Sequence, residues 1–383
     1  MIKKLFAMLI AAALAVMMFA ACGSTEEEDV DSVIGSYSNL DPELLSDYDY
    51  SKFKGQNITI NVANWGEYMS IAEPEMLDVN KAFERLTGVK VNYTTFVSNE
   101  TLYSKLLSGG AAYDIVVPSD YMISKMIKED MLQKLDYNNI PNFANIMPTF
   151  VSPEYDPENL YTVPYLWGMV VIIYNQTMVD EEITSWASLW DEKYANNILM
   201  FNNPRDAFGV ALTYLGYSQN TEDPKELEQA MLLLKEQKEV VQGYVMDEIF
   251  DKMEGGSAAI APYYAGDALV MMDENPDLGF AIPEEGTNLW LDSWVIPANA
   301  ENKENAEKWI DFLCRPDIAK MNFEYITYAT PNQGAFELLD EETQNNKAVF
   351  PDTDEIANAE VYQYLGTEAD DLYSRLWKEI KSE

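Results

Sequence analysis

The chain has 383 residues, of which 65 are acidic and 25 are basic, so its formal net charge at pH 7 is −40. A field of this sign repels nucleic acid and anionic membrane surfaces and attracts cations. The absence of histidine removes the usual general base of Ser-His and Cys-His catalysis, and two cysteines cannot form a four-cysteine zinc site. A soluble, acidic, exported protein would carry the same charge, so composition alone leaves the ligand open.

The N-terminal segment has the three parts of a secretory signal peptide. Two lysines form a positive region, residues 5–21 are apolar, and small residues precede Cys22. The Ala-Ala-Cys ending is similar to a bacterial lipobox, in which Cys22 would be lipidated and become the mature N-terminus. A transmembrane helix is the alternative, although about 17 apolar residues lie at the lower limit for spanning a bilayer. We expect a lipoprotein signal peptide at 1–22 and an acidic flexible tether at 23–54.

After the tether, strand patterns alternate with helix patterns. Apolar residues recur at every second position in 58–62, which predicts a strand. Val79, Phe83 and Leu86 share one face of a helix that Gly88 ends. Further strands are predicted at 89–93, 115–118, 169–174, 198–201 and 258–261. This alternation predicts an α/β fold with mostly parallel sheets.

Helix-start signals support the same organisation. Ser98 is the predicted N-cap of a helix over 99–108, which ends at a pair of glycines. Asp223 begins a segment with an N-cap residue, Pro at N1 and Glu at N3. Cys314 lies in an apolar helix, so we expect it to be a buried packing residue. With Cys22 lipidated, Cys314 would have no disulfide partner.

Aromatic and acidic side chains gather where the predicted strands end. In open α/β sheets, ligands bind beyond the carboxyl ends of the strands. Ring faces attract cations, and carboxylates accept hydrogen bonds from ammonium groups. These strand ends therefore favour a flexible organic cation whose methylenes lie on rings and whose nitrogens meet acids. The residues concerned are Trp65, Glu67, Tyr68, Ser119, Asp120, Tyr121, Asn203, Asp206, Tyr263 and Tyr264, together with Trp290, Asp292 and Trp294 on one face of a later strand.

Each of these residues also has a purely structural interpretation. An aromatic residue at a strand end often belongs to the core, and Glu67 can be a solvated surface acid. Asn203 and Asp206 are spaced as N-cap and N3 of a helix with Pro at N1. Asp292 is harder to explain in this way, because burying an acid between two tryptophans raises the free energy of the folded state unless a donor or a cation pairs with the acid.

Several longer segments are distinctive. They are Asn64-Trp65-Gly66-Glu67-Tyr68, Ser98-Asn99-Glu100-Thr101-Leu102-Tyr103, Tyr113-Asp114-Ile115-Val116-Val117-Pro118-Ser119, Ser185-Trp186-Ala187-Ser188-Leu189-Trp190, Trp290-Leu291-Asp292-Ser293 and Ile296-Pro297-Ala298-Asn299-Ala300. These segments closely resemble the spermidine/putrescine-binding proteins of ABC transporters, and the resemblance runs from about residue 57 to the C-terminus. It implies a two-lobed periplasmic-binding-protein fold with an interlobe ligand cleft and a hinge of crossover strands.

The resemblance also implies lobe boundaries. Lobe 1 would comprise 55–166 and 288–335, and lobe 2 would comprise 167–287 and 336–383. The chain would cross between the lobes near 164–168 and 286–290, with a further link in the 330s.

Site roles follow from the same resemblance. Trp65, Tyr121, Tyr263 and Trp290 would form aromatic walls, and Tyr263 stands where the spermidine binder has tryptophan. Asp292 would meet an inner or central amine, Glu67 and Asp206 would meet the ends of the ligand, and Ser119 and Tyr328 would make polar contacts.

Two further positions depart from the spermidine pattern. Asn203 stands where the spermidine binder has aspartate, and Tyr362 stands where it has glutamine. The loss of one carboxylate leaves room for putrescine as the ligand.

The leading hypothesis is a non-enzymatic, substrate-binding lipoprotein of a polyamine importer. It would be a monomer without cofactor, metal or nucleic-acid partner, held on the outer face of the cytoplasmic membrane by Cys22, and its closed form would dock on a membrane permease. One alternative is a binder of ferric iron, through tyrosines such as Tyr263 and Tyr264, or of another solute. The other is a secreted glycosidase that uses Glu67 and Asp292 as its two acids.

Overall fold

The computed structural model describes residues 57–66, 68–71, 77–110, 112–351, 356 and 358–382, which belong to one compact unit. The predicted signal peptide, the tether, Cys22 and Glu67 lie outside the described residues. No helix within those ranges combines the length and apolarity needed to cross a membrane.

A three-stranded parallel sheet forms one part of the fold, with the strand order β2-β1-β3. Parallel strands need crossover connections, and helices supply them here. The strands are β1 (Thr59–Trp65), β2 (Lys90–Phe96) and β3 (Ile115–Val116), and the helices that alternate with them are α4 (Val79–Thr87), α5 (Asn99–Leu107) and α6 (Asp120–Lys128). The strand–helix alternation predicted for this region is confirmed.

The predicted helix boundaries have the expected caps. Gly88 ends α4 in the left-handed conformation, with φ of 77°, which a residue without Cβ adopts without strain. The Ser98 side chain accepts a hydrogen bond from the backbone of Thr101 at the start of α5. Asp223 accepts from the Lys225 backbone at the start of α8 (Pro224–Gln237). The Glu226 carboxylate accepts a hydrogen bond from the Thr221 hydroxyl rather than reaching back to the N-cap.

The second sheet has seven strands in the order β10-β9-β4-β7-β5-β6, with β8 also paired to β4. It is mixed rather than parallel, because β4 runs antiparallel to β7, β8 and β9. A strand buried on both faces is a continuous apolar run, and such a run does not indicate strand direction. The strands are β4 (Val163–Asn175), β5 (Ile198–Phe201), β6 (Val241–Val245), β7 (Ile260–Tyr264), β8 (Leu278–Ala281), β9 (Asn288–Trp294) and β10 (Glu360–Val361).

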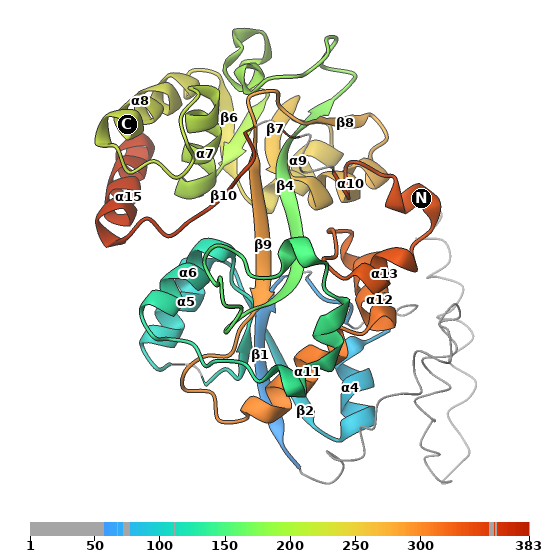
Figure 1. Ribbon diagram of the computed structural model, residues 1–383. Helices are drawn as coiled ribbons and strands as arrows, with labels where there is room; N and C mark the ends of the chain where they lie inside the picture. Colours follow the sequence, from blue (N-terminus) through green and yellow to red (C-terminus); the bar gives the residue numbers. More distant parts are fainter. Residues whose placement is uncertain are drawn as a thin grey trace, which may run out of the picture. The chain divides into compact units, whose positions relative to one another are not determined.

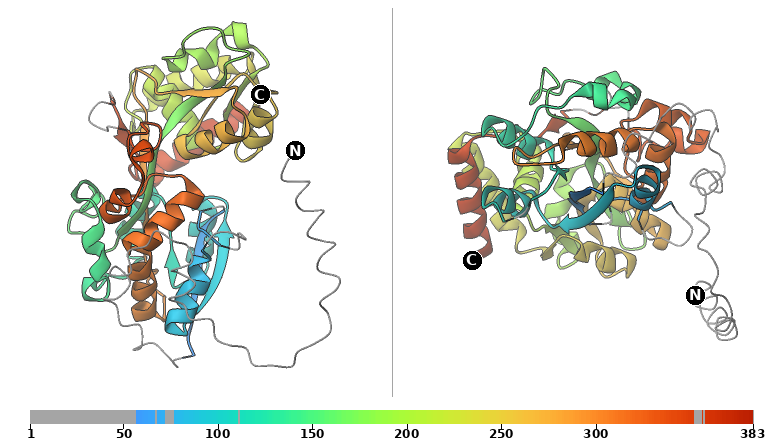
Figure 2. Two further views of the ribbon diagram at one scale, coloured as in Figure 1. Left: turned by 90° about the vertical axis from the view of Figure 1, so that its right-hand side faces the viewer. Right: turned by 90° about the horizontal axis from the view of Figure 1, so that it is seen from below.

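Helices cover both sheets (Figure 1). Those of the second half are α7 (Pro204–Tyr214), α8 (Pro224–Gln237), α9 (Glu248–Glu254), α10 (Ala265–Glu274), α11 (Lys303–Leu313), α12 (Pro316–Ile326), α13 (Gln333–Glu337), α14 (Glu341–Gln344) and α15 (Thr367–Ser382). Short 3₁₀ helices occupy Tyr137–Asn139, Pro141–Asn145, Pro148–Phe150, Trp186–Trp190 and Glu192–Tyr194. The C-terminal helix α15 packs on α7 and α8 and lies along the outer side of its lobe (Figure 2).

Strands β4 and β9 join the two lobes (Figures 1 and 2). They pair antiparallel from Val163 opposite Trp294 to Met169 opposite Leu289, and the register shifts between Pro164 and Leu166. Isolated bridges join β9 and the segment that follows it to β3 and the residues after β3, at Val116–Val295 and Ser119–Asp292. The predicted crossings near 164–168 and 286–290 therefore fall in or beside β4 and β9.

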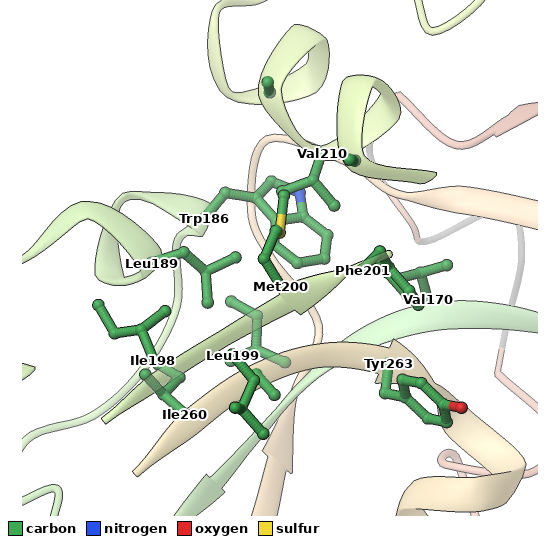
Figure 3. Packing of buried hydrophobic residues seen from close by; sticks show 14 of the residues in the cluster. Val170, Trp186, Leu189, Ile198, Leu199, Met200, Phe201, Val210, Ile260 and Tyr263 are labelled. Carbon is green, nitrogen blue, oxygen red and sulfur yellow. The ribbon is translucent and has the colours of Figure 1, made fainter. Parts of the chain in front are cut away.

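The larger apolar core lies around the seven-stranded sheet (Figure 3). Val170, Ile198, Met200 and Phe201 from its strands are almost completely buried beside Trp186. Burial of apolar surface on this scale is the main favourable contribution to folding. Cys314 is also buried, as predicted.

Candidate functional site

Asp292 lies at the centre of the candidate site, on strand β9. Its side chain is buried, and its Oδ2 accepts a hydrogen bond of 3.0 Å from the hydroxyl of Tyr68. Its Oδ1 is buried without any hydrogen-bond partner. Burial raises the pKa of Asp292 to about 7, while the nearby Ser119 and Tyr68 hydroxyls act against this shift. A buried oxygen with this much unused acceptor capacity favours a donor from a ligand.

Aromatic rings extend from Asp292 toward the other lobe. The ring of Tyr68 lies edge-on to Tyr328, with 5.7 Å between centroids, and Tyr328 lies edge-on to Trp290 at 5.1 Å. Two glycines make room for these rings. A Cβ on Gly168 would come within 2.6 Å of the Trp290 ring, and a Cβ on Gly266 would come equally close to Tyr328.

The row of rings ends at a second buried acid, Asp206. The centroid of the Tyr264 ring lies 6.4 Å from that of Trp290, and its hydroxyl donates a 2.6 Å hydrogen bond to Asp206 Oδ2. Burial raises the pKa of Asp206, and hydrogen bonds from Tyr264 and then Asn203 oppose the shift. We call the connected set Asp292, Tyr68, Tyr328, Trp290, Tyr264 and Asp206 the acid–aromatic cluster.

Asn203 is the N-cap of helix α7. Its Oδ1 accepts a 2.9 Å hydrogen bond from the backbone of Asp206, and its Nδ2 donates to the Asp206 carboxylate. The capping interpretation raised by the sequence is therefore the one that the structure shows. Asn203 also helps to hold Asp206 in the cluster.

Tyr263 takes a different position from the one expected of an aromatic wall. Its side chain is only 2% exposed and lies in the larger apolar core (Figure 3). It stacks on Phe201 with 5.6 Å between centroids and meets Phe250 edge-on. It contacts the acid–aromatic cluster through the ring of its neighbour Tyr264, 5.1 Å away. Tyr264 rather than Tyr263 reaches Trp290 and Asp206, and the wall role of Tyr263 stays a prediction. The sequence contained both tyrosines, but adjacent aromatics at a strand end do not indicate which one faces a site.

Trp65 also has a packing role. Its indole nitrogen donates a 2.9 Å hydrogen bond to the carbonyl of Val117, and its ring lies 4.5 Å from Phe96. The side chain remains half-buried at the end of β1. It therefore ties the end of β1 to the end of β2 and to the residue after β3, three residues before Tyr68 in the chain.

Ser119 and Tyr121 are held by α5. The Asn99 amide nitrogen lies 3.1 Å from the hydroxyl oxygens of both Ser119 and Tyr121 and donates to them. The Tyr121 hydroxyl donates to Glu100 Oε1 at 3.0 Å. Across from it, the Tyr121 ring meets Tyr362 edge-on, with 6.5 Å between centroids.

A basic residue lies beside this pair, which the sequence analysis did not assign. The guanidinium carbon of Arg205 is 4.6 Å from the ring centroid of Tyr362 and 5.9 Å from that of Tyr121. Arg205 is buried, and it immediately precedes Asp206 in α7. The site therefore carries an internal cation at the Asp206 end.

Two further acids have raised pKa values, and the sequence analysis missed one of them, Asp267, as a candidate ligand. Burial raises the pKa of Asp267, in the first turn of α10, to about 7, and a hydrogen bond from Tyr328 opposes the shift. Burial, with a smaller contribution from the charge of Asp292, raises the pKa of Asp120 to about 8. Acids are common in the first turn of a helix, where they stabilise the positive end of the helix dipole. The sequence therefore did not mark Asp267 as a candidate ligand. Perturbed carboxylates gathered in this way are typical of functional sites.

The cluster can bind an organic cation. It offers carboxylates for ammonium groups and ring faces for methylenes or for the cation itself. Among the residues that the structure describes, no group of three or more His, Cys, Asp or Glu side chains could hold a metal ion. For the ferric-iron alternative, the two adjacent tyrosines do not act together, because Tyr264 bonds Asp206 while Tyr263 packs in the core.

Residues 79–351 match the family model of bacterial extracellular solute-binding proteins. The chain belongs to this family. The family resemblance inferred from the sequence motifs is confirmed, and so is the two-lobed α/β fold.

Individual proteins that are similar to this chain support the same family. The chain is 40% identical over 328 residues to the spermidine/putrescine-binding periplasmic protein of Escherichia coli, covering 85% of this chain and 92% of that protein. It is similar to the solved structure of the spermidine/putrescine ABC transporter substrate-binding protein PotD of Streptococcus pneumoniae, with 39% identity, a TM-score of 0.74, and coverage of 85% and 99% of the two chains. The Tp0655 (TpPotD) lipoprotein of Treponema pallidum is 25% identical with a TM-score of 0.73, and coverage is 85% and 100%.

Proposed function

We propose that this chain is the extracytoplasmic substrate-binding lipoprotein of an ABC importer and that its ligand is a polyamine, spermidine or putrescine. The names of its relatives support the polyamine class, since the Escherichia coli and Streptococcus pneumoniae proteins are both described as spermidine/putrescine proteins. The protein binds and releases its ligand without a chemical step, and the closed form docks on a membrane permease.

The observation that carries this proposal is the unpaired, buried Oδ1 of Asp292 beside Trp290 and Tyr68. A polyamine ammonium group has several N–H donors and would satisfy this oxygen by a charge-assisted hydrogen bond. The methylene chain then lies along Trp290 and the neighbouring tyrosines, where its apolar surface leaves water. A second ammonium group meets Asp267 or Asp206, and Glu67 supplies a further carboxylate.

A ligand amine also removes the electrostatic penalty of several buried acids. Burial raises the pKa of Asp292, Asp267 and Asp206 above the usual range, so the charged forms are disfavoured in the unliganded protein. An ammonium group close to these carboxylates stabilises the charged forms. Binding at neutral pH therefore releases protons from the site.

The two lobes divide as 55–166 with 288–335 and 167–287 with 336–383. Closure then brings Ser119 and Tyr121 of the first lobe toward Asp206 and Tyr264 of the second. Cys22 carries the lipid that anchors the protein to the outer face of the cytoplasmic membrane, and residues 23–54 form the tether. The protein acts as a monomer, without a cofactor, metal or nucleic-acid partner.

Isothermal titration calorimetry against putrescine, cadaverine, spermidine and spermine tests the proposal. Saturable binding of at least one polyamine, with no heat from glucose or ferric citrate, is the expected result. A charge-transfer band on adding ferric salt would favour the iron alternative. Release of a chromophore from a chromogenic glycoside would favour the glycosidase, whose second acid, Glu67, lies outside the described residues.

A further inference from the structure

Two lysines of α6 contact the segment that leads from β10 into α15, outside the acid–aromatic cluster. The Lys125 ammonium nitrogen lies 3.7 Å from Asp370 Oδ2 and 5.4 Å from the centroid of the Tyr364 ring. The Lys128 nitrogen lies 4.9 Å from the same centroid and donates a 3.4 Å hydrogen bond to the Tyr364 carbonyl. Tyr364 therefore interacts with both lysine charges, and Asp370 pairs with one of them.

The two sides of this contact belong to different apolar cores and to different lobes (Figure 1). Met122 and Met126 bury α6 in the core of the three-stranded sheet, together with Phe96. Leu376 and Ile380 of α15 belong to the larger core around the seven-stranded sheet. The contact between α6 and the segment before α15 therefore bridges the lobes, and it breaks when the lobes separate.

Lys125 is held in place for this contact from its own lobe. Its side chain is only 18% exposed, and its nitrogen lies 4.4 Å from the ring centroid of Tyr103 on α5. An isolated ion pair on a protein surface contributes little, because water and salt screen it. A cation that has lost part of its water gains more from an aromatic face. Here two rings and one carboxylate act on the same ammonium group.

The segment on the other side of the contact is fixed to its own lobe. The Asn220 side chain, beyond the end of α7, accepts a 2.9 Å hydrogen bond from the Gln363 backbone and donates one of 2.9 Å to the carbonyl of Val361. The Gln363 amide also donates a 2.9 Å hydrogen bond to Glu154 Oε2, which precedes β4. Tyr364 is therefore presented to the lysines by a backbone that is held on both sides.

We propose that Lys125, Lys128, Tyr364 and Asp370 form a latch that holds the lobes closed and slows the release of the bound ligand. This inference rests on the proposed function, and it assigns control of ligand release to residues outside the acid–aromatic cluster. A contact that exists only in the closed form shifts the population toward that form. The ligand leaves after the contact breaks, so the latch acts on the dissociation rate constant more than on the association rate constant.

Stopped-flow kinetics of putrescine and spermidine with the full-length protein test the latch. Lys125→Met/Lys128→Met removes both charges and keeps unbranched side chains. We expect the dissociation rate constant to rise about tenfold, the scale of two cation–aromatic contacts. The association rate constant should not fall, because a more negative protein attracts a cationic ligand at least as strongly.

Lys105→Met/Lys134→Met is the matched control. Both lysines are exposed, and their replacement changes the net charge by the same amount. The control should leave the dissociation rate constant within about twofold of the wild type, because neither lysine belongs to the latch.

Each contrary outcome has a separate meaning. An unchanged dissociation rate constant in Lys125→Met/Lys128→Met, or an equal rise in the control, overturns the latch and leaves the polyamine function standing. Slower association with unchanged dissociation also overturns the latch, because it assigns the lysines to the encounter with the ligand. A wild type that binds neither polyamine overturns the proposed function and the latch with it. If the double variant does not fold, Tyr364→Leu removes the ring from the opposite lobe and decides by the same dissociation rate constant.

Discussion

Replacement of Asp292 by asparagine isolates the charge of the central carboxylate. The asparagine oxygen can still accept the hydrogen bond from Tyr68, which Asp292 Oδ2 accepts at 3.0 Å. The amide nitrogen then stands where Oδ1 has no partner, and it presents N–H donors to an incoming ammonium group. The substitution therefore removes one charge-assisted hydrogen bond and opposes donors to donors.

The expected loss of binding free energy is about 2–5 kcal/mol, the range for removing one partner of a buried charged pair. This corresponds to a weakening of the dissociation constant by roughly 30-fold to a few thousandfold. Calorimetry at pH 8 is the appropriate assay, because the pKa of Asp292 is raised to about 7 and the wild-type carboxylate is mostly ionised there.

Asp311→Asn provides the matched control. Asp311 is also buried, its Oδ2 also has no partner, and burial raises its pKa to about 6, but it lies on α11 outside the cluster. The control should bind polyamine like the wild type. Near-native affinity in a folded Asp292→Asn protein would remove Asp292 from the site and refute the reasoning.

Further tests concern the pH dependence of stability, the role of Asn203 and the lipid anchor. Burial raises the pKa values of Asp292 and Asp267 to about 7 and of Asp120 to about 8. Between about pH 4 and pH 8 the folded state therefore holds more protons than the unfolded state, and this contribution to stability is lost as the pH rises through 7–8. The melting temperature of the unliganded protein should fall between pH 5.5 and 8, less steeply in Asp292→Asn; an equal slope in the two proteins would contradict this. Asn203→Asp retains an N-cap and adds a carboxylate beside Asp206, so competition binding should shift toward spermidine by about 1–2 kcal/mol, whereas an unmoved ratio leaves Asn203 as a cap only. Cys22→Ala should abolish incorporation of a labelled fatty acid, and label retained in the variant would refute lipid anchoring.

The sequence predicted the elements whose pattern is local. Alternation in β1, the αL glycine after α4 and the serine cap of α5 each arise from a few neighbouring residues, and all three are present. Strand direction in the second sheet was not predictable, because β4 is buried along nearly its whole length and presents no alternation. The antiparallel pairing of β4 with β9 also depends on contacts between residues more than 100 positions apart in the chain.

The candidate site was predictable as a class of chemistry and less so as a set of residues. Asp292 stood out because it lies between Trp290 and Trp294, and the structure buries it with an unpaired oxygen. The choice between Tyr263 and Tyr264 depended on which ring packs against Phe250 and which reaches Asp206. Such distinctions come from tertiary packing, which strand-end patterns do not contain.

Arg205 and Asp267 show the same limit. Within the sequence, each resembles an ordinary residue of a first helical turn, in α7 and α10 respectively. Only the folded chain brings Tyr121 and Tyr362 to Arg205, and Tyr328 to Asp267. Their relation to the cluster is therefore a property of the assembled lobes.

A crystal structure of the protein with putrescine tests the central claim most directly. The account predicts a ligand nitrogen about 2.7–2.9 Å from Asp292 Oδ1, the distance of a charge-assisted hydrogen bond, and the methylene chain against the Trp290 ring. A ligand bound elsewhere, or one whose nitrogens leave Asp292 Oδ1 unpaired, would contradict it.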